Sequence, residues 1–161
     1  MEQILKITDL FVTYQTERAT TYALNGLNLT IHCGESLGLV GESGAGKTTT
    51  ALSILRLLQA GVGKVTHGEI LYRDRSVFSM SKRELMQLRG GEISMIFQNP
   101  LTSLNPVFTV GEQIAMVLRK HRNLTSRAAD SHAKELLEMV GIPGERARDY
   151  PMQFSGGMRQ R

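Results

Sequence analysis

The chain has 161 residues, which is enough for one domain with a hydrophobic core. Its 19 lysines and arginines and 15 aspartates and glutamates give a net charge of +4, which permits contact with nucleotides, nucleic acid or anionic lipid headgroups but identifies none of them. No apolar run is long enough to span a bilayer, the first residues lack a signal-peptide pattern, and the single cysteine, Cys33, excludes an intrachain disulfide, so we expect a reducing, cytosolic compartment.

The first predicted elements are strands of a small antiparallel sheet. Residues 4–14 are apolar with polar interruptions and predict one strand or two short ones, and residues 15–21 are polar and turn-like. Residues 22–32 alternate apolar and polar side chains, which predicts a half-buried strand. Tyr14 ends the first strand beside the polar turn. An aromatic ring at this position is able to stack on a nucleotide base, but the local pattern alone favours an ordinary strand tyrosine.

Residues 41–49, GESGAGKTT, match the phosphate-binding pattern G-x-x-x-x-G-K-[ST] without a mismatch. Glycines let the backbone turn tightly, so that successive N–H groups can point at a polyphosphate. Lys47 supplies a mobile cation for the β- and γ-phosphates, and the Thr48 hydroxyl can hold Mg²⁺. The candidate binding residues are Gly41, Glu42, Ser43, Gly44, Ala45, Gly46, Lys47, Thr48 and Thr49.

The flanks of this loop predict the strand and the helix that the pattern requires. Residues 35–40 end in an apolar run that predicts a buried strand, and residues 49–58 carry leucines at helical spacing. A phosphate would then lie at the N-terminus of the helix. A glycine-rich turn with a chance lysine is the alternative, and it does not account for either flank.

The middle of the chain predicts further sheet and helix. Residues 68–72 predict a short strand, and residues 81–84 form a capping box that opens a helix reaching about residue 89. Residues 93–97 predict a compact, mostly apolar strand that ends at Gln98. A polar side chain leaving the end of a strand in an α/β sheet is where ligand contacts are expected, although a loop glutamine is the usual case.

From about residue 107 onward the sequence predicts mainly helix. Residues 109–112 form a second capping box, and residues 119–122 are a charge run that favours a solvated helix end over a nucleic-acid patch, because no aromatic residues interleave it. A further helix is stopped by Gly141 and Pro143. The predicted apolar faces are Ile114, Val117 and Leu118 on the first helix and Ala129, Ala133, Leu136, Leu137 and Val140 on the second.

Ser155, Gly156 and Gly157 precede a last predicted helical turn. A serine and two glycines entering a helix can form a second anion-binding helix start. Taken alone, such a stretch is more often a flexible loop, and at the end of a chain it can be a frayed terminus.

Together these segments resemble an ABC-transporter ATPase subunit. The resemblance is carried by Tyr14, by GESGAGKTT at 41–49, by MIFQNPLTSLNP at 95–106, by TVGEQI at 109–114 and by FSGGMRQR at 154–161. MIFQNPLTSLNP and FSGGMRQR resemble the oligopeptide/dipeptide/nickel importer branch in particular. That branch commonly carries methionine where many ABC proteins have glutamine, and Met158 occupies this position.

The resemblance implies ATP and Mg²⁺ as cofactors and assigns roles to the matching residues. Tyr14 is similar to the aromatic residue that stacks on adenine, and residues 41–49 to the Walker A loop. Thr48 and Gln98 match the two Mg²⁺ ligands, and Lys47 and Gln98 are the catalytic candidates. Gln98 also lies in what resembles the loop that senses the membrane partner.

A second group of residues is implied to act on a different subunit. Ser155, Gly156 and Gly157 match the signature motif, which in the family completes the ATP site of the opposite subunit in a head-to-tail dimer. The implied partners are transmembrane permease subunits, a second ABC ATPase subunit that is identical or related, and indirectly a solute-binding protein, but not nucleic acid. The implied location is peripheral, on the cytoplasmic face of the plasma membrane.

The implied fold is the α/β P-loop NTPase fold of ABC ATPases. We expect an N-terminal antiparallel β-subdomain and a partial RecA-like core within residues 1–106, and an α-helical subdomain over residues 107–161. The family continues into a Walker B strand with an aspartate, a water-activating glutamate and a switch histidine, whereas this sequence stops at Arg161. We therefore expect an incomplete nucleotide-binding domain, marginally stable by itself, that hydrolyses ATP poorly.

Three alternatives remain beside the importer ATPase. The first is a truncated ATP-binding module without hydrolytic activity. The second is a soluble ABC ATPase acting on DNA or ribosomes, which would be expected to carry inserted zinc cysteines or a long coiled coil. The third is a P-loop kinase outside the ABC family, which the FSGGM segment disfavours.

Overall fold

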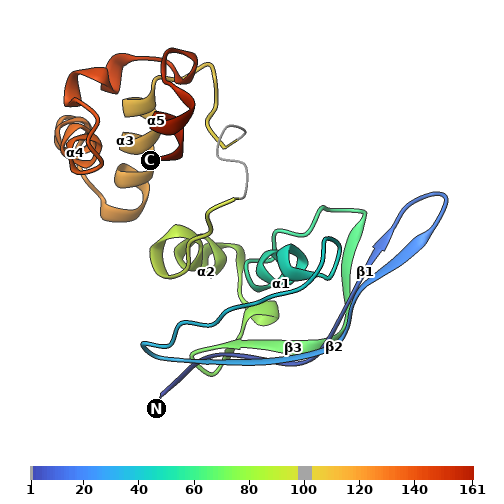
Figure 1. The fold of residues 1–161 in the computed structure, drawn as a ribbon. Helices are drawn as coiled ribbons and strands as arrows, with labels where there is room; N and C mark the ends of the chain where they lie inside the picture. Colours follow the sequence, from blue (N-terminus) through green and yellow to red (C-terminus); the bar gives the residue numbers. More distant parts are fainter. Residues whose placement is uncertain (1, 98–102) are drawn as a thin grey trace. The chain divides into compact units, whose positions relative to one another are not determined.

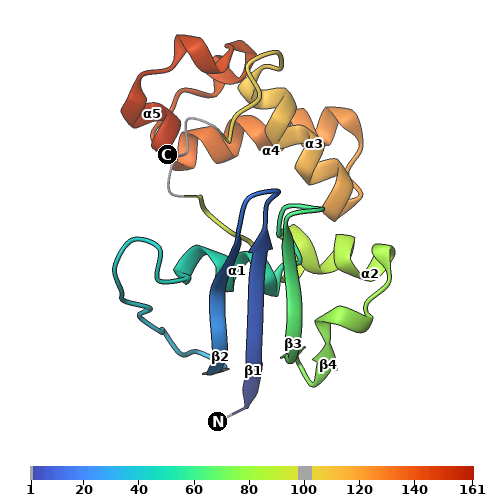
Figure 2. The same ribbon diagram turned by 90° about the vertical axis from the view of Figure 1, so that its right-hand side faces the viewer.

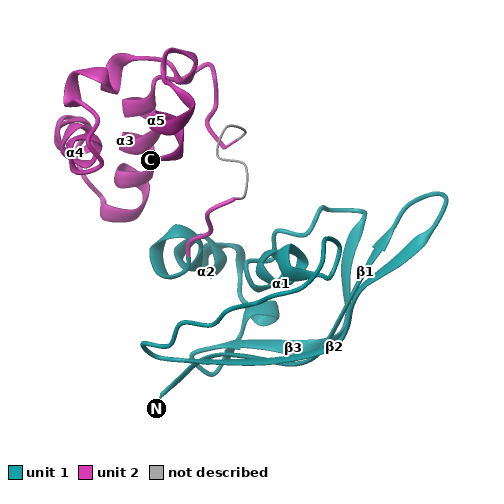
Figure 3. Ribbon diagram, in the orientation of Figure 1, with its two compact units in different colours: residues 1–93 teal, residues 94–161 magenta. Residues whose placement is uncertain are grey.

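The structure is a computed structural model that describes residues 2–97 and 103–161 (Figure 1). The chain forms two compact units, residues 1–93 and residues 94–161 (Figure 3). The second unit thus includes residues 94–106, which the sequence analysis grouped with the sheet-bearing part. The functional division at residue 107 stays a prediction.

Unit 1 is built on a four-stranded antiparallel sheet, and its first two strands agree with the sequence prediction. The strands lie in the order β2-β1-β3-β4 (Figure 2). Strand β3 starts before the predicted residue 68, and the two-residue strand β4 was not predicted. The bounds are β1 Gln3–Gln15, β2 Thr20–His32, β3 Gly63–Tyr72 and β4 Arg75–Ser76.

A bulge interrupts the central pairing of this sheet. Asp9 has a positive φ of 47°, and the register between β1 and β3 shifts between Thr8 and Phe11. Gly68 lies opposite with φ +91°, and a Cβ atom there would be 2.2 Å from the carbonyl oxygen of Asp9. Only glycine permits this close approach of two backbones, so Gly68 allows the bulge at this point of the β1–β3 pairing.

The core of unit 1 lies between the sheet and the helices that cover one of its faces, α1 (Lys47–Ile54) and α2 (Lys82–Gln87) (Figure 1). A 3₁₀ turn, η1 (Val77–Ser79), precedes α2, and a distorted turn, η2 (Leu88–Glu92), follows it. The Ser81–Glu84 capping box that opens α2 is confirmed. The buried core residues are Leu5, Ile7, Leu10, Val12, Leu24, Ile70, Tyr72, Val77, Leu85 and Leu88.

Two predicted strands are wrong, the buried strand at residues 35–40 and the mostly apolar strand at residues 93–97. Residues 35–40 are irregular and exposed, and residues 93–97 contain only an isolated bridge at Ile93. Val40 and Ile96 are each 94% exposed. A buried strand needs hydrogen-bonding neighbours for its N–H and C=O groups, and within the described ranges the sheet strands pair only with one another. Apolar composition alone therefore did not make these segments strands.

Unit 2 is helical, as predicted. Its elements are α3 (Val110–Arg122), α4 (Ser126–Met139), η4 (Gly144–Arg148), η5 (Pro151–Gln153) and α5 (Gly156–Gln160). The Thr109–Glu112 capping box at the start of α3 is confirmed, and Gly141 ends the α4 region with φ +73°. None of the described helices combines the length and the apolar character that a membrane span requires.

The buried faces of these helices differ in detail from the prediction. Ala129, Ala133 and Leu137 are buried on α4, but Val140 is 36% exposed. On α3 the buried residues include Ala115 and Leu118, whereas Val117 is 56% exposed. Small alanines form the contact between α3 and α4, because they let the two helix backbones approach closely. Ala129 and Ala133 were predicted for this face, whereas on α3 the prediction named Val117 and not Ala115.

Candidate nucleotide-binding site

The loop at residues 41–46 leads directly into α1, as the sequence predicts. Gly46 has φ +85°, and a Cβ atom at this position would lie 2.6 Å from the Leu24 side chain and 2.7 Å from the carbonyl oxygen of Ala23. A residue with a side chain is excluded here both by conformation and by space. No side chain caps the N-terminus of α1. Its first-turn N–H groups are therefore left available to a ligand.

Lys47, the first residue of α1, folds back over the loop. Its Nζ donates hydrogen bonds to the carbonyl oxygens of Gly41 and Glu42, both at 2.6 Å. The ammonium group is thus held at the loop rather than extended into solvent. An anion bound in the loop would offer Lys47 stronger acceptors than these two neutral carbonyls.

The three threonines that follow Lys47 have different surroundings. Thr48 is exposed, and its hydroxyl has no hydrogen-bond partner within the described part of the chain. Thr49 and Thr50 are buried, and the Thr50 hydroxyl donates to the carbonyl of Gly46 at 3.0 Å. Of the three, Thr48 is the one whose oxygen is available to a metal ion. Hydroxyl oxygen is a suitable ligand for Mg²⁺.

Tyr14 lies beside the start of α1. Its hydroxyl oxygen is 3.5 Å from the Thr49 hydroxyl oxygen, and Gly63 is its partner on β3. A Cβ atom on Gly63 would be 2.9 Å from the Tyr14 ring. The structure therefore brings Tyr14 and residues 41–49 together within unit 1.

The other predicted site residues are not part of this cluster. Gln98 lies outside the described residues. Ser155, Gly156 and Gly157 belong to unit 2, where the Ser155 hydroxyl oxygen accepts a hydrogen bond from the Met158 N–H at 3.3 Å. Both glycines are exposed, and a Cβ atom on either would meet nothing within 4 Å. Their backbone is accordingly open to close approach by another molecule.

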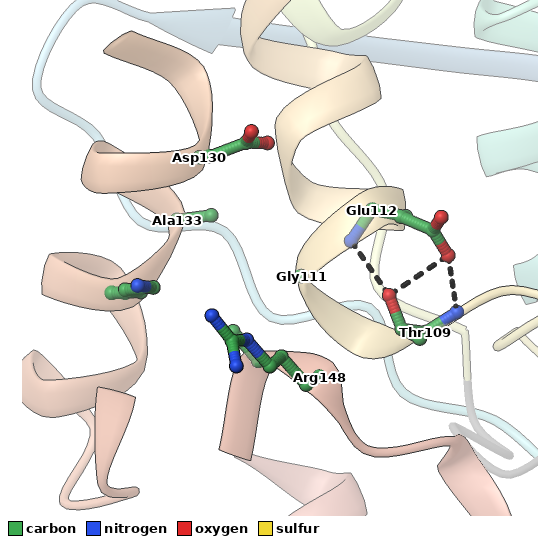
Figure 4. A pocket seen from close by; sticks show the side chains of 8 residues that line it. Thr109, Gly111, Glu112, Asp130, Ala133 and Arg148 are labelled. Atoms are coloured by element: carbon green, nitrogen blue, oxygen red, sulfur yellow. Dashed lines mark hydrogen bonds between the residues drawn. The ribbon is translucent and has the colours of Figure 1, made fainter. Parts of the chain in front are cut away.

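Unit 2 also contains a cavity of about 330 Å³ that the sequence analysis missed (Figure 4). It lies among α3, α4 and η4, and buried small residues line it: Gly111, Ala133 and Ala147. Its charged lining residues are all exposed and comprise Glu112, Asp130, Lys134 and Arg148. One sequence signal does exist, a glycine in the first turn of a helix. A Cβ atom on Gly111 would lie 2.7 Å from the carbonyl oxygen of Ala147.

The charges around this cavity differ in how they are held. The backbone N–H and the hydroxyl of Thr109 lower the pKa of Glu112, so this carboxylate stays ionised as part of the helix cap. Asp130, Lys134 and Arg148 take part in none of the ion pairs found in the described ranges. The cavity thus presents two carboxylates and two cations, of which three groups are available to an outside partner.

The fold and the phosphate loop define a protein of the P-loop class. The sequence model of the ABC transporter family matches residues 24–161, and the chain belongs to this family. The resemblance stated from the sequence motifs is thereby confirmed.

Relatives over the whole chain are ATP-binding proteins of peptide transporters. The chain is 44% identical over 163 residues to the dipeptide transport ATP-binding protein DppD of Bacillus subtilis, covering 100% of this chain and 49% of that protein. It is 44% identical over 161 residues to the oligopeptide transport ATP-binding protein OppD of the same species, covering 99% and 45%. The chain spans about half the length of these curated relatives.

Solved structures agree with the predicted fold class. The dimeric post-hydrolysis state of the ATP-binding cassette MJ0796, bound to ADP and Pi, superposes with a TM-score of 0.81 at 30% identity. The match covers 98% of this chain and 66% of the MJ0796 chain. The α/β fold of an ABC ATPase cassette is therefore confirmed for this chain.

Proposed function

We propose that the protein is the ATP-binding subunit of a peptide importer, and that it couples ATP binding and hydrolysis to uptake through membrane permease subunits. The observation that carries the proposal is the uncapped start of α1, with Lys47 held at the loop and Tyr14 beside it. The peptide substrate is inferred from the names of the relatives, which are dipeptide and oligopeptide transport proteins. Nickel is the other substrate class that the motifs suggest.

We assign the residues of unit 1 to parts of the nucleotide. The N–H groups of residues 41–49 and Lys47 hold the phosphates, where backbone donors and a cation oppose their negative charge. Thr48 holds Mg²⁺ together with Gln98. Tyr14 contacts the adenine ring, because an aromatic face provides a flat apolar surface for a base. Bound Mg²⁺ would neutralise charge on the phosphates during transfer to water, with Lys47 and Gln98 as the catalytic residues.

We assign Ser155, Gly156 and Gly157 to the nucleotide of a second ATPase subunit. Their exposure and the open space around the glycines support this assignment, as does the dimeric state of MJ0796. In this arrangement the protein works as a dimer with an identical or related subunit. It lies at the cytoplasmic face of the membrane, and a solute-binding protein acts only through the permease.

The permease subunits contact unit 2, and we place this contact at the cavity among α3, α4 and η4 (Figure 4). The buried floor of small residues accommodates a protruding segment, while Asp130, Lys134 and Arg148 are available for charge pairing. Charge reversal at Lys134 and Arg148 together should abolish co-purification with the permease and leave ATP binding unchanged. Charge reversal at Arg127 is the matched control. This arginine lies on α4 with Lys134, is exposed and does not line the cavity.

A second candidate function is ATP binding without hydrolysis. Val40, directly before the loop, is 94% exposed, so the chain entering the phosphate site is not packed on that side. Hydrolysis requires a water and a metal held in fixed positions, whereas binding requires only the loop.

The test compares wild type with Lys47→Ala and with the control Lys82→Ala, an exposed lysine at the start of α2. ATP affinity is measured with a fluorescent analogue, phosphate release by a coupled assay, and uptake with labelled peptide and with nickel. We expect Lys47→Ala to lower ATP affinity at least tenfold and to abolish peptide uptake, whereas Lys82→Ala behaves as wild type. Binding without phosphate release would support the second candidate. Equal ATP affinity in all three proteins would refute the role of Lys47, and absence of ATP binding in wild type would refute both candidates.

A further inference from the structure

Beside the contact that Gly46 makes with Leu24 and Ala23 at its start, helix α1 is also held in unit 1 at its C-terminal end. Its buried residues are the small polar side chains Thr49, Thr50 and Ser53, and the Ser53 hydroxyl bonds to the helix's own backbone. The apolar anchor Leu55 lies just beyond the helix. Because α1 has only eight residues, whatever fixes this end also determines how its first N–H groups are aimed.

Arg89 donates two hydrogen bonds to the C-terminal end of α1. Its Nε donates to the carbonyl oxygen of Leu55 and its Nη2 to that of Arg56, both at 2.7 Å. These bonds join segments 33 and 34 residues apart in the sequence. A cation is favourable at this position, because the C-terminal end of a helix carries partial negative charge.

Arg56 makes a second link from the same point. It has a positive φ of 50°, unusual for a residue with a side chain, and its Nη1 lies within 3.5 Å of the carbonyl oxygens of Val77, Phe78 and Met80. The conformation that turns Arg56 toward η1 also presents its carbonyl to Arg89. The end of α1 is thereby tied to the chain on both sides of α2.

The backbone around Arg89 is closed into a tight turn. The N–H of Ile93 bonds to the carbonyl of Leu88, and the N–H of Gly90 to the carbonyl of Ile93, both at 2.8 Å. Leu88 is 2% exposed and belongs to the core of unit 1. The boundary between the two units follows at once, after residue 93. The last segment of unit 1 is thus the segment that holds α1.

From these contacts we infer that Arg89 is a positioning residue for the phosphate loop, and that it links the loop to the segment where the chain leaves unit 1. A nucleotide that fixes the N-terminal end of α1 also fixes its C-terminal end, and through Arg89 it stabilises residues 88–93. Linkage requires the reverse as well, so loosening this segment weakens nucleotide binding. The inference rests on the proposed function, because it takes the loop to be the nucleotide site.

This link is tested by hydrogen exchange of the protein, measured with and without a non-hydrolysable ATP analogue and Mg²⁺. In wild type we expect the analogue to protect residues 41–50 and also residues 88–97. In Arg89→Gln we expect about tenfold weaker binding and, at saturating analogue, protection of residues 41–50 alone. Arg89→Lys retains the charge but reaches one carbonyl instead of two. Its analogue affinity and its protection of residues 88–97 should lie between those of wild type and Arg89→Gln.

The chain offers a matched control in Arg161, which donates to the carbonyl oxygens of Val140 and Gly141 after α4 at 3.0 and 3.4 Å. Arg161→Gln should leave analogue affinity and both protected segments as in wild type. Undiminished protection of residues 88–97 in Arg89→Gln, or its absence in nucleotide-bound wild type, would overturn the inference.

If wild type bound no analogue, the proposed function would fail, and the exchange of residues 49–57 without nucleotide would decide whether Arg89 holds α1. Faster exchange there in Arg89→Gln than in Arg161→Gln supports the clamp, and equal exchange refutes it. If Arg89→Gln failed to fold, the same comparison would be made with Arg89→Lys.

Discussion

The α-helices of this protein begin in two ways. Four of those described start at a serine or threonine whose side chain accepts a hydrogen bond from the first turn, namely Ser81, Thr109, Thr125 and Ser155. Helix α1 starts instead at Gly46, in a left-handed conformation and without a side-chain cap. A hydroxyl cap stabilises a helix from within the chain, whereas a glycine start leaves the N–H groups for a ligand. The helix start at the candidate site therefore lacks the stabilisation of a hydroxyl cap and leaves its first N–H groups open to a ligand.

Placing a side chain at the uncapped start should have the largest effect. Gly46→Ala combines a left-handed residue with a Cβ atom 2.7 Å from the carbonyl of Ala23, and we expect a loss of roughly 3 kcal/mol in the free energy of unfolding, measured in urea. Gly44 has a similar φ, +87°, but open space around it. Gly44→Ala should therefore cost about 1 kcal/mol, and equal losses in the two variants would contradict the steric explanation.

Removing a cap should give α4 an uncapped start like that of α1. The Thr125 side chain accepts a hydrogen bond from the Ala128 N–H at 3.3 Å. Thr125→Ala should lower the free energy of unfolding by about 1 kcal/mol without changing nucleotide affinity. Thr125→Ser retains the hydroxyl and should remain close to wild type. A loss of nucleotide affinity in Thr125→Ala would show that the two kinds of helix start are not independent.

Acid should weaken the capped starts that contain a glutamate. The backbone N–H and the hydroxyl of Ser81, together with Arg75, lower the pKa of Glu84 from an ordinary 4.5 to about 2. Because the folded pKa is the lower one, the stabilisation is present above about pH 4.5 and is lost as the pH falls toward 2. The effect should be smaller than loss of a cap, because this carboxylate is exposed to solvent.

The variant that isolates this charge is Glu84→Gln, since glutamine can keep the capping hydrogen bond but does not titrate. Thermal unfolding between about pH 5 and pH 2 should show a shallower decline for the variant than for wild type. Parallel curves would mean that the Glu84 carboxylate does not contribute to acid sensitivity.

The smallest effect is expected just before the uncapped helix. Val40 is 94% exposed, so Val40→Ser should change the free energy of unfolding by no more than about 0.5 kcal/mol. Leu24→Ser, in the core beside Gly46, is the contrasting variant and should be severely destabilising. If Val40→Ser lowered the free energy of unfolding by more than about 2 kcal/mol, Val40 would be buried, as the predicted strand at residues 35–40 required.

The features predicted correctly from the sequence are those set by neighbouring residues. The glycine loop, the two capping boxes and the alternating strand at residues 22–32 each depend on a few residues close in the chain, so their patterns are legible. Tyr14 and the loop were assigned to one site by resemblance; the Tyr14 hydroxyl lies 3.5 Å from that of Thr49, and the function of these residues stays a prediction.

The features that were missed depend on distant partners. Residues 35–40 and 93–97 have strand-like composition, but a strand exists only where another strand pairs with it. Arg89 reads as an exposed residue at a helix end, and its function as a clamp is set by carbonyls more than 30 residues earlier. The cavity of unit 2 is formed by three separate segments, so no single stretch of sequence predicts it.

The hydrogen bonds of Lys47 have a thermodynamic consequence for any anion that enters the loop. Because its ammonium group already bonds to the Gly41 and Glu42 carbonyls, an incoming phosphate must displace these two acceptors. The enthalpy that Lys47 contributes is therefore the difference between phosphate and carbonyl acceptors, about 1 kcal/mol per bond, and not the full strength of a new ion pair. Calorimetry of anion binding to the loop should accordingly find a modest binding enthalpy.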